Sequence, residues 1–187
     1  MSMLLAVIAD THVGDREKSL PDSVLTTLQA SQPQQIFHAG DIVAPQVLQQ
    51  LAQVAPTVAV QGNVDFLHWR NWRLPLARSF EIEGLRIGLT HGHGGWGQYL
   101  YEKWVYLRGG PMALPIEFYL TRLPRLFATE MDVVIFGHTH RPFRRKIGNT
   151  LYFNPGSVGR AHGFEHIPQI GFLHLERGQV RTEWTRV

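Results

Sequence analysis

The nine residues DVVIFGHTH, which run from Asp132 to His140, decide the fold that we predict for this chain. Four consecutive apolar residues predict a buried strand, and the glycine after them permits a tight turn. His138 and His140 follow at the exit of that strand, two residues apart. Because alternate residues of an extended segment point the same way, we expect both imidazoles to converge on one point. One His-x-His pair arises easily by chance, but four other segments of the chain end in a similar way.

Four other predicted strands also run into residues that commonly bind metals. These strands are expected at 3–9, 35–38, 57–60 and 85–89. The residues that follow them are Asp10 and His12, then Asp41, Asn63 and His91. Open α/β sheets bind their ligands beyond the carboxyl ends of the strands, so we expect these side chains to meet at one rim.

The predicted elements indicate an α/β fold in a single domain, 1–187. Amphipathic helices are expected at 20–30 and 43–54, so the opening half reads β-α-β-α-β, which predicts parallel strands with right-handed crossovers. The second half is rich in β-structure that we expect to be antiparallel, with a turn over Asn154 to Ser157. Its strands are expected at 79–83, 85–89, 141–147, 150–153, 169–175 and 179–184. Two sheets packed face to face, with helices outside, follow from this pattern.

The composition is that of an ordinary globular domain and excludes several kinds of site. A chain of 187 residues is long enough for one sizeable core. Because the sequence has no cysteine, disulfides and thiolate metal sites are excluded. The formal net charge of +3 is too small to indicate nucleic-acid binding by itself. The opening apolar run is too short for a signal peptide or a membrane span, so we expect a cytoplasmic protein without a membrane-spanning segment.

The range 94–127 departs from this pattern as an aromatic-rich insertion, with helical spacing at 98–107 and 116–126. Its aromatic residues include Trp96, Tyr99, Tyr101, Trp104, Tyr106, Phe118 and Tyr119. Three interpretations are open: ordinary packing, a homo-oligomer surface, since aromatic residues are enriched in interface cores, or a cap over the site. Its position directly after His91 and His93 favours the cap slightly.

The candidate ligands outnumber those that a single catalytic metal ion takes, because seven residues at five strand exits exceed the usual three or four. Two divalent ions that share one carboxylate would use all seven and leave positions for water. Two ions about 3.5–4 Å apart suit in-line displacement at phosphorus, because water between them loses a proton near neutral pH. Mixed histidine, carboxylate and amide ligands suit Mn2+, Fe2+, Zn2+ or Ni2+ better than Ca2+.

Five ordered motifs resemble those of the calcineurin-like metallophosphoesterases. The motifs are Asp10-x-His12, Gly40-Asp41, Gly62-Asn63-x-Asp65, His91-Gly92-His93 and Gly137-His138-Thr139-His140. The short chain and the sequence NPGS at 154–157 resemble the small single-domain branch of bacterial and archaeal phosphodiesterases. That branch also contains the eukaryotic retromer subunit with this fold. The resemblance covers most of the chain outside about 94–127.

The resemblance implies a four-layer α-β-β-α sandwich of two mixed sheets around a dinuclear metal centre. By the family pattern, one ion is held by Asp10, His12, Asp41 and His140. The second ion is held by Asp41 again, as the bridging ligand, with Asn63, His91 and His138. Mn2+ is the ion that we expect first, with Zn2+, Fe2+ and Ni2+ as alternatives.

One motif departs from the family pattern at the position after Asn63. Many relatives carry a histidine there that protonates the leaving group, whereas this chain has Val64, which cannot move a proton. The small branch often lacks that histidine. The departure favours substrates with good leaving groups or another donor, for which His93 is our candidate. Asn63 and Asp65 complete the expected catalytic set, and Asp65 is expected to orient His12 or a neighbour.

The remaining histidines and the basic run near the last motif receive ordinary interpretations. His38 falls within a predicted strand and is expected to be a packed core residue. We assign no role to His68, His162, His166 and His174. The basic run 144–146 is expected to be a solvated surface.

These features predict a metal-dependent hydrolase of phosphate esters, more specifically a phosphodiesterase that uses a metal-activated hydroxide. An intact ligand set without a recognisable monoester clamp favours diesters, so small phosphate esters or nucleotide diesters are the expected substrates. The alternative is a catalytically weak scaffold for protein binding on the same fold, which would predict eroded ligands. A nuclease is a third interpretation, which the small size and weak positive charge oppose. The physiological substrate, the native metal and the oligomeric state stay open.

Overall fold

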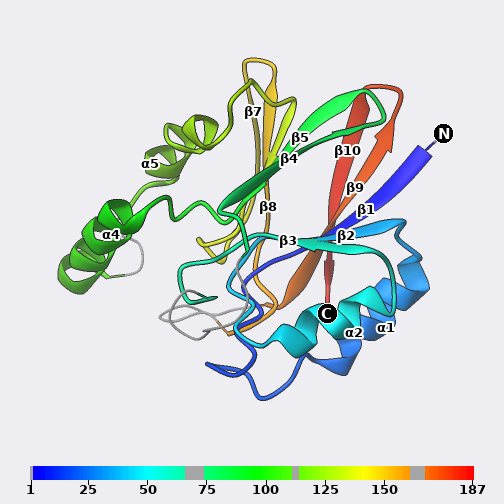
Figure 1. Cartoon of the computed structure of the whole chain (residues 1–187), viewed down its shortest axis with the longest axis horizontal. Helices are drawn as coiled ribbons and strands as arrows, with labels where there is room; N and C mark the ends of the chain where they lie inside the picture. The colour runs from blue at the N-terminus through cyan, green and yellow to red at the C-terminus, as the bar shows by residue number, and fades with distance from the viewer. Residues whose placement is uncertain (1, 66–73, 111–113, 161–166) are drawn as a thin grey trace.

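The computed structural model describes residues 2–65, 74–110, 114–160 and 167–187. They form two five-stranded sheets that pack face to face, with helices on the outer faces (Figure 1). The predicted four-layer α-β-β-α arrangement is therefore confirmed. Three histidines without an assigned role, His68, His162 and His166, lie outside the described residues, as does the side chain of Trp96.

The first sheet is built on the parallel unit at the start of the chain. β1 (Ser2–Ile8) pairs in parallel with β2 (Gln35–His38), and β2 pairs in parallel with β3 (Thr57–Ala59). The crossover helices are α1 (Asp22–Ser31) and α2 (Pro45–Ala52). These elements confirm the predicted β-α-β-α-β opening. The parallel order brings three strand exits to one edge of the sheet.

The C-terminal hairpin completes the first sheet on the other side of β1. β9 (Gln169–Glu176) pairs antiparallel with β1, and β10 (Gln179–Arg186) pairs antiparallel with β9. Side chains of β1 alternate between the two faces of the sheet, as the pleat requires. Ala6 packs in the core beneath α1 and α2, whereas Leu5 packs in the core between the two sheets.

The second sheet is mixed, so the expectation that the second half of the chain is antiparallel is wrong. Its strands are β4 (Ala77–Ile82), β5 (Leu85–Thr90), β6 (Val133–Ile135), β7 (Pro142–Ile147) and β8 (Thr150–Pro155). The order is β4-β5-β6-β8-β7, with β5, β6 and β8 parallel and only the hairpins β4–β5 and β7–β8 antiparallel. Parallel neighbours require a crossover connection, which the long segment between β5 and β6 provides, and β6 pairs with β8 while the intervening strand β7 lies at the edge.

The insertion between β5 and β6 contains α4 (Trp96–Gly109), α5 (Ile116–Leu120) and the 3-10 helix η1 (Leu123–Leu126). The prediction of one continuous helix over 116–126 is wrong. Pro124 has no N–H for a helical bond, and its ring would clash with the preceding turn, so the α-helix ends earlier. Residues of α5 and η1 pack against the outer face of the second sheet and form its fourth layer.

The helix α4 lies at the periphery, beyond the second sheet (Figure 1). Leu100, Trp104 and Leu107 are 61%, 51% and 81% exposed. Among the α4 residues whose side chains are described, Glu102 alone is buried. Within the described ranges, none of the helices combines the length and hydropathy that a bilayer crossing requires.

Candidate metal centre

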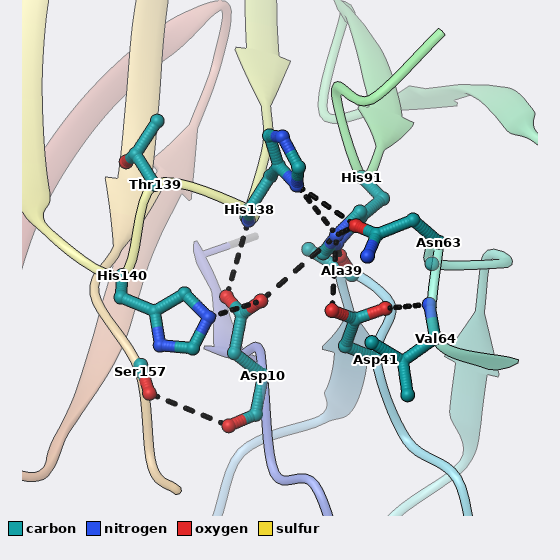
Figure 2. Close-up of polar contacts among 12 residues, drawn as sticks. Asp10, Ala39, Asp41, Asn63, Val64, His91, His138, Thr139, His140 and Ser157 are labelled. Atoms are coloured by element: carbon teal, nitrogen blue, oxygen red, sulfur yellow. Dashed lines mark hydrogen bonds and ion pairs between the residues drawn. The ribbon is translucent and has the colours of Figure 1, made fainter. Parts of the chain in front are cut away.

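The exits of strands from both sheets bring all seven predicted ligands to one place. Figure 2 labels six of them, all except His12. The first sheet supplies Asp10, His12, Asp41 and Asn63 from the loops after β1, β2 and β3. The second sheet supplies His91 after β5, and His138 and His140 after β6. Because each loop starts where a buried strand ends, the packing of the two sheets sets the distances between these side chains.

Four of the seven side chains form one tight group: the ligand atoms of Asp10, His12, Asp41 and His140 lie within 4.8 Å of one another. His140 Nε2 lies 3.4 Å from Asp10 Oδ1, and His12 Nε2 lies 3.6 Å from Asp41 Oδ2. Ligands that bind one ion at about 2.0–2.2 Å stand about 3.0–3.5 Å apart, so this spacing fits one cation. Asp10 Oδ1 is buried and accepts no hydrogen bond from the described residues, which also suits a metal ligand.

The other three side chains form a second group around the Asn63 amide oxygen. Asn63 Oδ1 lies 3.0 Å from His91 Nε2 and 2.9 Å from His138 Nδ1, and the two ring nitrogens are 3.2 Å apart. Asp41 Oδ2 lies 3.5 Å from His91 Nε2 and 3.6 Å from His12 Nε2 of the first group. One carboxylate oxygen therefore stands beside both groups, and the residues could hold a second cation with it.

The backbone is left-handed at five of these residues. The φ angles are 53° at Asp10, 49° at His12, 55° at Asp41, 68° at His138 and 56° at His140. Residues other than glycine rarely adopt this conformation, which costs roughly 1–3 kcal/mol each and is found at functional sites. The surrounding packing and hydrogen bonds have to offset that cost.

The left-handed turns correct the expectation for His138 and His140. The alternation rule predicted an extended segment that aims both rings at one point. Instead, as the family pattern implied, His138 faces Asn63 and His91 while His140 faces Asp10 (Figure 2). The physical reason is that the alternation rule applies to extended backbone, whereas φ is positive at both histidines. The pair is therefore divided between the two groups.

Asp65 holds the loop that carries Asp41. Its carboxylate accepts hydrogen bonds from the backbone N–H groups of Gly62, Asp41, Ile42 and Val43, at 2.7–3.0 Å. Burial, and next the charge of Asp41, raise the pKa of Asp65 although these donors oppose the rise. The neighbour that it orients is thus the Asp41 loop, whereas the sequence suggested His12 as one of two alternatives.

The NPGS stretch supports the opposite side of the site. Asn154 Nδ2 donates to Gly137 O at 2.7 Å. The Ser157 hydroxyl donates to Asp10 O at 3.3 Å (Figure 2). Its first two residues belong to β8, so the predicted turn begins two residues later than expected. These bonds brace the backbone at two ligand-bearing loops.

Two glycines allow the ligand loops to approach one another closely. A Cβ on Gly62 would collide with the backbone and carboxylate of Asp41. Gly40 has a φ of 89°, and a Cβ there would lie 2.8 Å from His91 Nδ1. The Gly-Asp and Gly-Asn motifs therefore reflect close approach as well as turn geometry.

Burial and mutual charge shift the pKa values of the ligands in opposite directions. Burial raises the pKa of Asp10 to about 8, and burial lowers the pKa of His12 to about 4. Burial alone would raise the pKa of Asp41, but the positive charge of His91 lowers it below the ordinary range. Burial likewise opposes the charge of His91, but Asp41 raises the pKa of that imidazole to about 10. A cation that binds here would therefore have to displace a proton from Asp10 and from His91.

His93 lies beside the second group and lines a cavity of about 150 Å³ next to it. Its ring centroid is 5.4 Å from that of His91 and 6.4 Å from that of His138. Burial, followed by the charges of those two histidines, lowers the pKa of His93 to about 3, so the ring is neutral near pH 7. The cavity is lined by Gln61, Asn63, Leu76, His93, Gly94, Gly95 and Tyr99.

Glu102 is the residue of the site that sequence reasoning missed. Its Oε2 lies 2.6 Å from His138 Nε2, although the residue belongs to the insertion helix. The signal in the sequence is weak: Glu102 and Glu117 are the acidic residues of an otherwise aromatic and basic stretch, 94–127. His38 behaves as expected, because it is fully buried and its Nε2 lies 3.2 Å from the Thr11 hydroxyl.

Comparison with known proteins identifies the family to which this architecture belongs. A model of the calcineurin-like phosphoesterase superfamily domain matches residues 3–178. The chain belongs to this superfamily. The resemblance of its five motifs is thereby confirmed, and the family implies divalent metal ions, for which the donor set and the buried Asp10 Oδ1 are suitable.

Relatives of this calcineurin-like phosphoesterase include probable metallophosphoesterases and vacuolar protein sorting-associated proteins. A probable metallophosphoesterase of Methanothermobacter thermautotrophicus is 37% identical over 159 residues, 83% of this chain and 77% of that protein. Vacuolar protein sorting-associated protein 29 of Schizosaccharomyces pombe is 27% identical over 159 residues, 83% and 72% of the two chains. A crystal structure of Vps29 from Entamoeba histolytica, complexed with Zn2+, has a TM-score of 0.65 at 23% identity, with 98% and 99% coverage, and shows the same fold.

Metal binding by this phosphoesterase should release protons near pH 7. Asp10 and His91 have raised pKa values of about 8 and 10, so both carry a proton there in the metal-free protein. A cation must displace these protons, so we expect release of about two protons and an affinity that increases with pH. Calorimetric titration with Mn2+ in two buffers of different ionisation enthalpy measures the number of protons released on metal binding.

In that titration, Asp10→Asn serves as the control, because it removes one titrating group and should lower the number by about one. Identical heats in both buffers would contradict the assignment of protons to this site.

The left-handed backbone predicts an unusual order of stabilities at His140. In the metal-free protein, His140→Gly should be more stable than His140→Ala by about 1 kcal/mol, because alanine resists a positive φ and glycine does not. Urea unfolding in the presence of a chelator measures the difference. At Arg145, within the extended strand β7, the order should reverse, so that Arg145→Ala is more stable than Arg145→Gly. The same order at both positions would show that the His140 backbone is not strained.

Proposed function

We propose that the protein is a dinuclear metal-dependent phosphodiesterase. The observation that carries this proposal is the position of Asp41 Oδ2, 3.6 Å from His12 Nε2 and 3.5 Å from His91 Nε2, between two groups of ligand atoms. Two ions held by these groups would share that oxygen. Paired ions about 3.5–4 Å apart suit in-line displacement at phosphorus.

The proposed ligand sets follow the two groups of side chains. One ion would be held by Asp10, His12, Asp41 and His140, and the other by Asp41, Asn63, His91 and His138. Mixed nitrogen and oxygen ligands suit Mn2+, with Zn2+, Fe2+ or Ni2+ as alternatives. When bound, such ions neutralise charge on the phosphoryl oxygens and lower the pKa of an attacking water.

Several residues of the chain fix the direction in which each ligand atom points. Val64 N–H donates to Asp41 Oδ1 at 2.8 Å, which leaves Oδ2 for the two groups. The His91 Nδ1–H group donates a hydrogen bond to Ala39 O at 2.7 Å, so Nε2 of the same ring faces Asn63 and Asp41. Such hydrogen bonds set the tautomer and orientation of ligands before a metal binds.

The substrate side of the proposal rests on the cavity beside Asn63 and His93. Its volume of about 150 Å³ suits one substituent of a small diester, such as the leaving group of a nucleotide diester. We propose that His93 contacts this group, while its lowered pKa of about 3 counts against the predicted role of His93 as the proton donor. Because Val64 replaces a proton donor and the His93 ring is neutral near pH 7, we expect esters with good leaving groups to be favoured.

A protein-binding scaffold is the second candidate function. It is supported by the likeness to vacuolar protein sorting-associated protein 29 and by the outward-facing Leu100, Trp104 and Leu107 of α4. A scaffold has no need of complete metal ligands, whereas this chain has a ligand-type residue at all seven positions. Stable binding of a purified partner by a protein that takes up no metal would reverse our preference.

The activity itself tests the leading proposal. Protein loaded with Mn2+ should hydrolyse bis-p-nitrophenyl phosphate, and a chelator should abolish the reaction. Asp41→Asn keeps the shape but removes the shared anionic oxygen, so the rate should fall by about 100-fold or more. Asp132→Asn is the matched control, because Asp132 pairs with Arg86 on the second sheet and should leave the rate unchanged. No turnover with Mn2+, Zn2+, Fe2+ or Ni2+, with metal content confirmed, would contradict the proposal.

The divided histidine pair makes a separate prediction about metal content. His138→Ala should lose one ion and His140→Ala the other, because the rings face different groups. Metal analysis after dialysis should therefore give about one bound ion for each single variant and about two for the wild type. Loss of both ions in each variant, in a protein that remains folded, would contradict two separable sites.

A further inference from the structure

One buried carboxylate near the proposed metal centre has no part in the reaction described above. Glu102 is 7% exposed, although most of α4 around it faces solvent. Burial of a carboxylate costs free energy unless hydrogen bonds compensate for it. The contacts of Glu102 therefore indicate what this side chain does.

Both carboxylate oxygens of Glu102 have a partner in the site. Oε2 lies 2.6 Å from His138 Nε2, and Oε1 accepts a hydrogen bond from Gln98 Nε2 at 2.8 Å. Gln98 Nε2 also lies 3.3 Å from Gly92 O, in the loop between His91 and His93. The insertion helix is thus tied to two of the loops that carry proposed ligands.

The contact with Glu102 determines which nitrogen of His138 carries the proton. An ionised carboxylate only accepts hydrogen bonds, so Nε2 has to carry a proton. The other nitrogen, Nδ1, lies 2.9 Å from Asn63 Oδ1 and 3.2 Å from His91 Nε2, so it is the nitrogen whose lone pair would bind a cation held by this group. Metal-ligating histidines commonly donate the second N–H to a carboxylate in this way.

We infer that Glu102 is a positioning residue that holds His138 in the tautomer and orientation needed by the second metal ion. This inference rests on the proposed dinuclear function and extends it to the insertion, because the carboxylate comes from α4 rather than from either sheet. It also gives the insertion a specific task at the site. The helix that lies outside the sandwich would complete the surroundings of one ion and leave the other unaffected.

A simpler role for Glu102 has different consequences. A carboxylate that only anchors α4 would affect the stability of the helix but not the affinity of one particular ion. A positioning role affects the second ion selectively, because Glu102 touches none of the side chains of the first group. In that group, neighbouring ligand atoms of Asp10, His12, Asp41 and His140 lie 3.4–3.6 Å apart. Metal affinity, measured site by site, therefore separates the two roles.

The experiment compares wild-type protein with Glu102→Gln by calorimetric titration with Mn2+. We expect the affinity of the second ion, defined as the one lost in His138→Ala, to fall about 10- to 100-fold, while the first is unchanged. Glu117→Gln is the matched control, because this glutamate of α5 pairs with Arg145 at the surface. Thermal unfolding of the metal-free variants checks that all of them fold.

The proton position on His138 gives a readout that a merely structural role would not change. In metal-free protein, long-range proton–nitrogen correlation on the neutral form of the His138 ring should show Nε2–H in the wild type, and Glu102→Gln should populate Nδ1–H. Wild-type protein in the Nδ1–H form, or a Glu102→Gln variant that binds both ions as the wild type does, would overturn the inference alone. A wild type that binds a single Mn2+ would contradict the dinuclear function. The tautomer measurement would then still decide whether Glu102 determines which nitrogen of the His138 ring carries the proton.

Discussion

The buried carboxylate of Asp41 is the group on which the rest of the site depends. Its Oδ1 accepts a hydrogen bond from the Val64 N–H group, and its Oδ2 lies between His12 and His91. An anion at this depth is stable only if positive charge or donors surround it, and His91 responds with a raised pKa. Asp65 fixes the loop on which Asp41 sits, so this arrangement is kept before any cation arrives.

The site also depends on the packing of one sheet against the other. The first sheet carries four of the seven ligand-type residues and the second sheet carries three, so neither sheet forms a complete group of ligands for two ions. Fully buried residues such as Phe37 and Phe153 fill the core between the sheets and set their separation. The left-handed turns then aim the side chains across the shared rim, at a cost in backbone strain that the packed framework offsets.

The insertion connects the periphery of the molecule to this rim. On its inner side, Glu102 forms a hydrogen bond with His138, whereas Leu100, Trp104 and Leu107 point outward into solvent. The same helix can therefore influence a metal ligand and present an apolar surface. Among the three interpretations of the aromatic residues, a contribution to the site has specific contacts behind it, because the Tyr119 ring packs edge-on against His138 and Tyr99 lines the cavity beside His93.

The sequence by itself determined the main elements and the ligand types, because buried strands read as apolar runs and the polar residues at their exits are local features. The hairpins, the crossover helices and the gathering of Asp10, Asp41 and His91 follow from those runs and from the parallel order. Only the tertiary structure decided that β5, β6 and β8 are parallel, that the backbone is left-handed at His138 and His140, and that Glu102 reaches His138 across 36 positions of the chain. These features depend on positive φ angles and on long-range pairing, which hydrophobic periodicity does not encode.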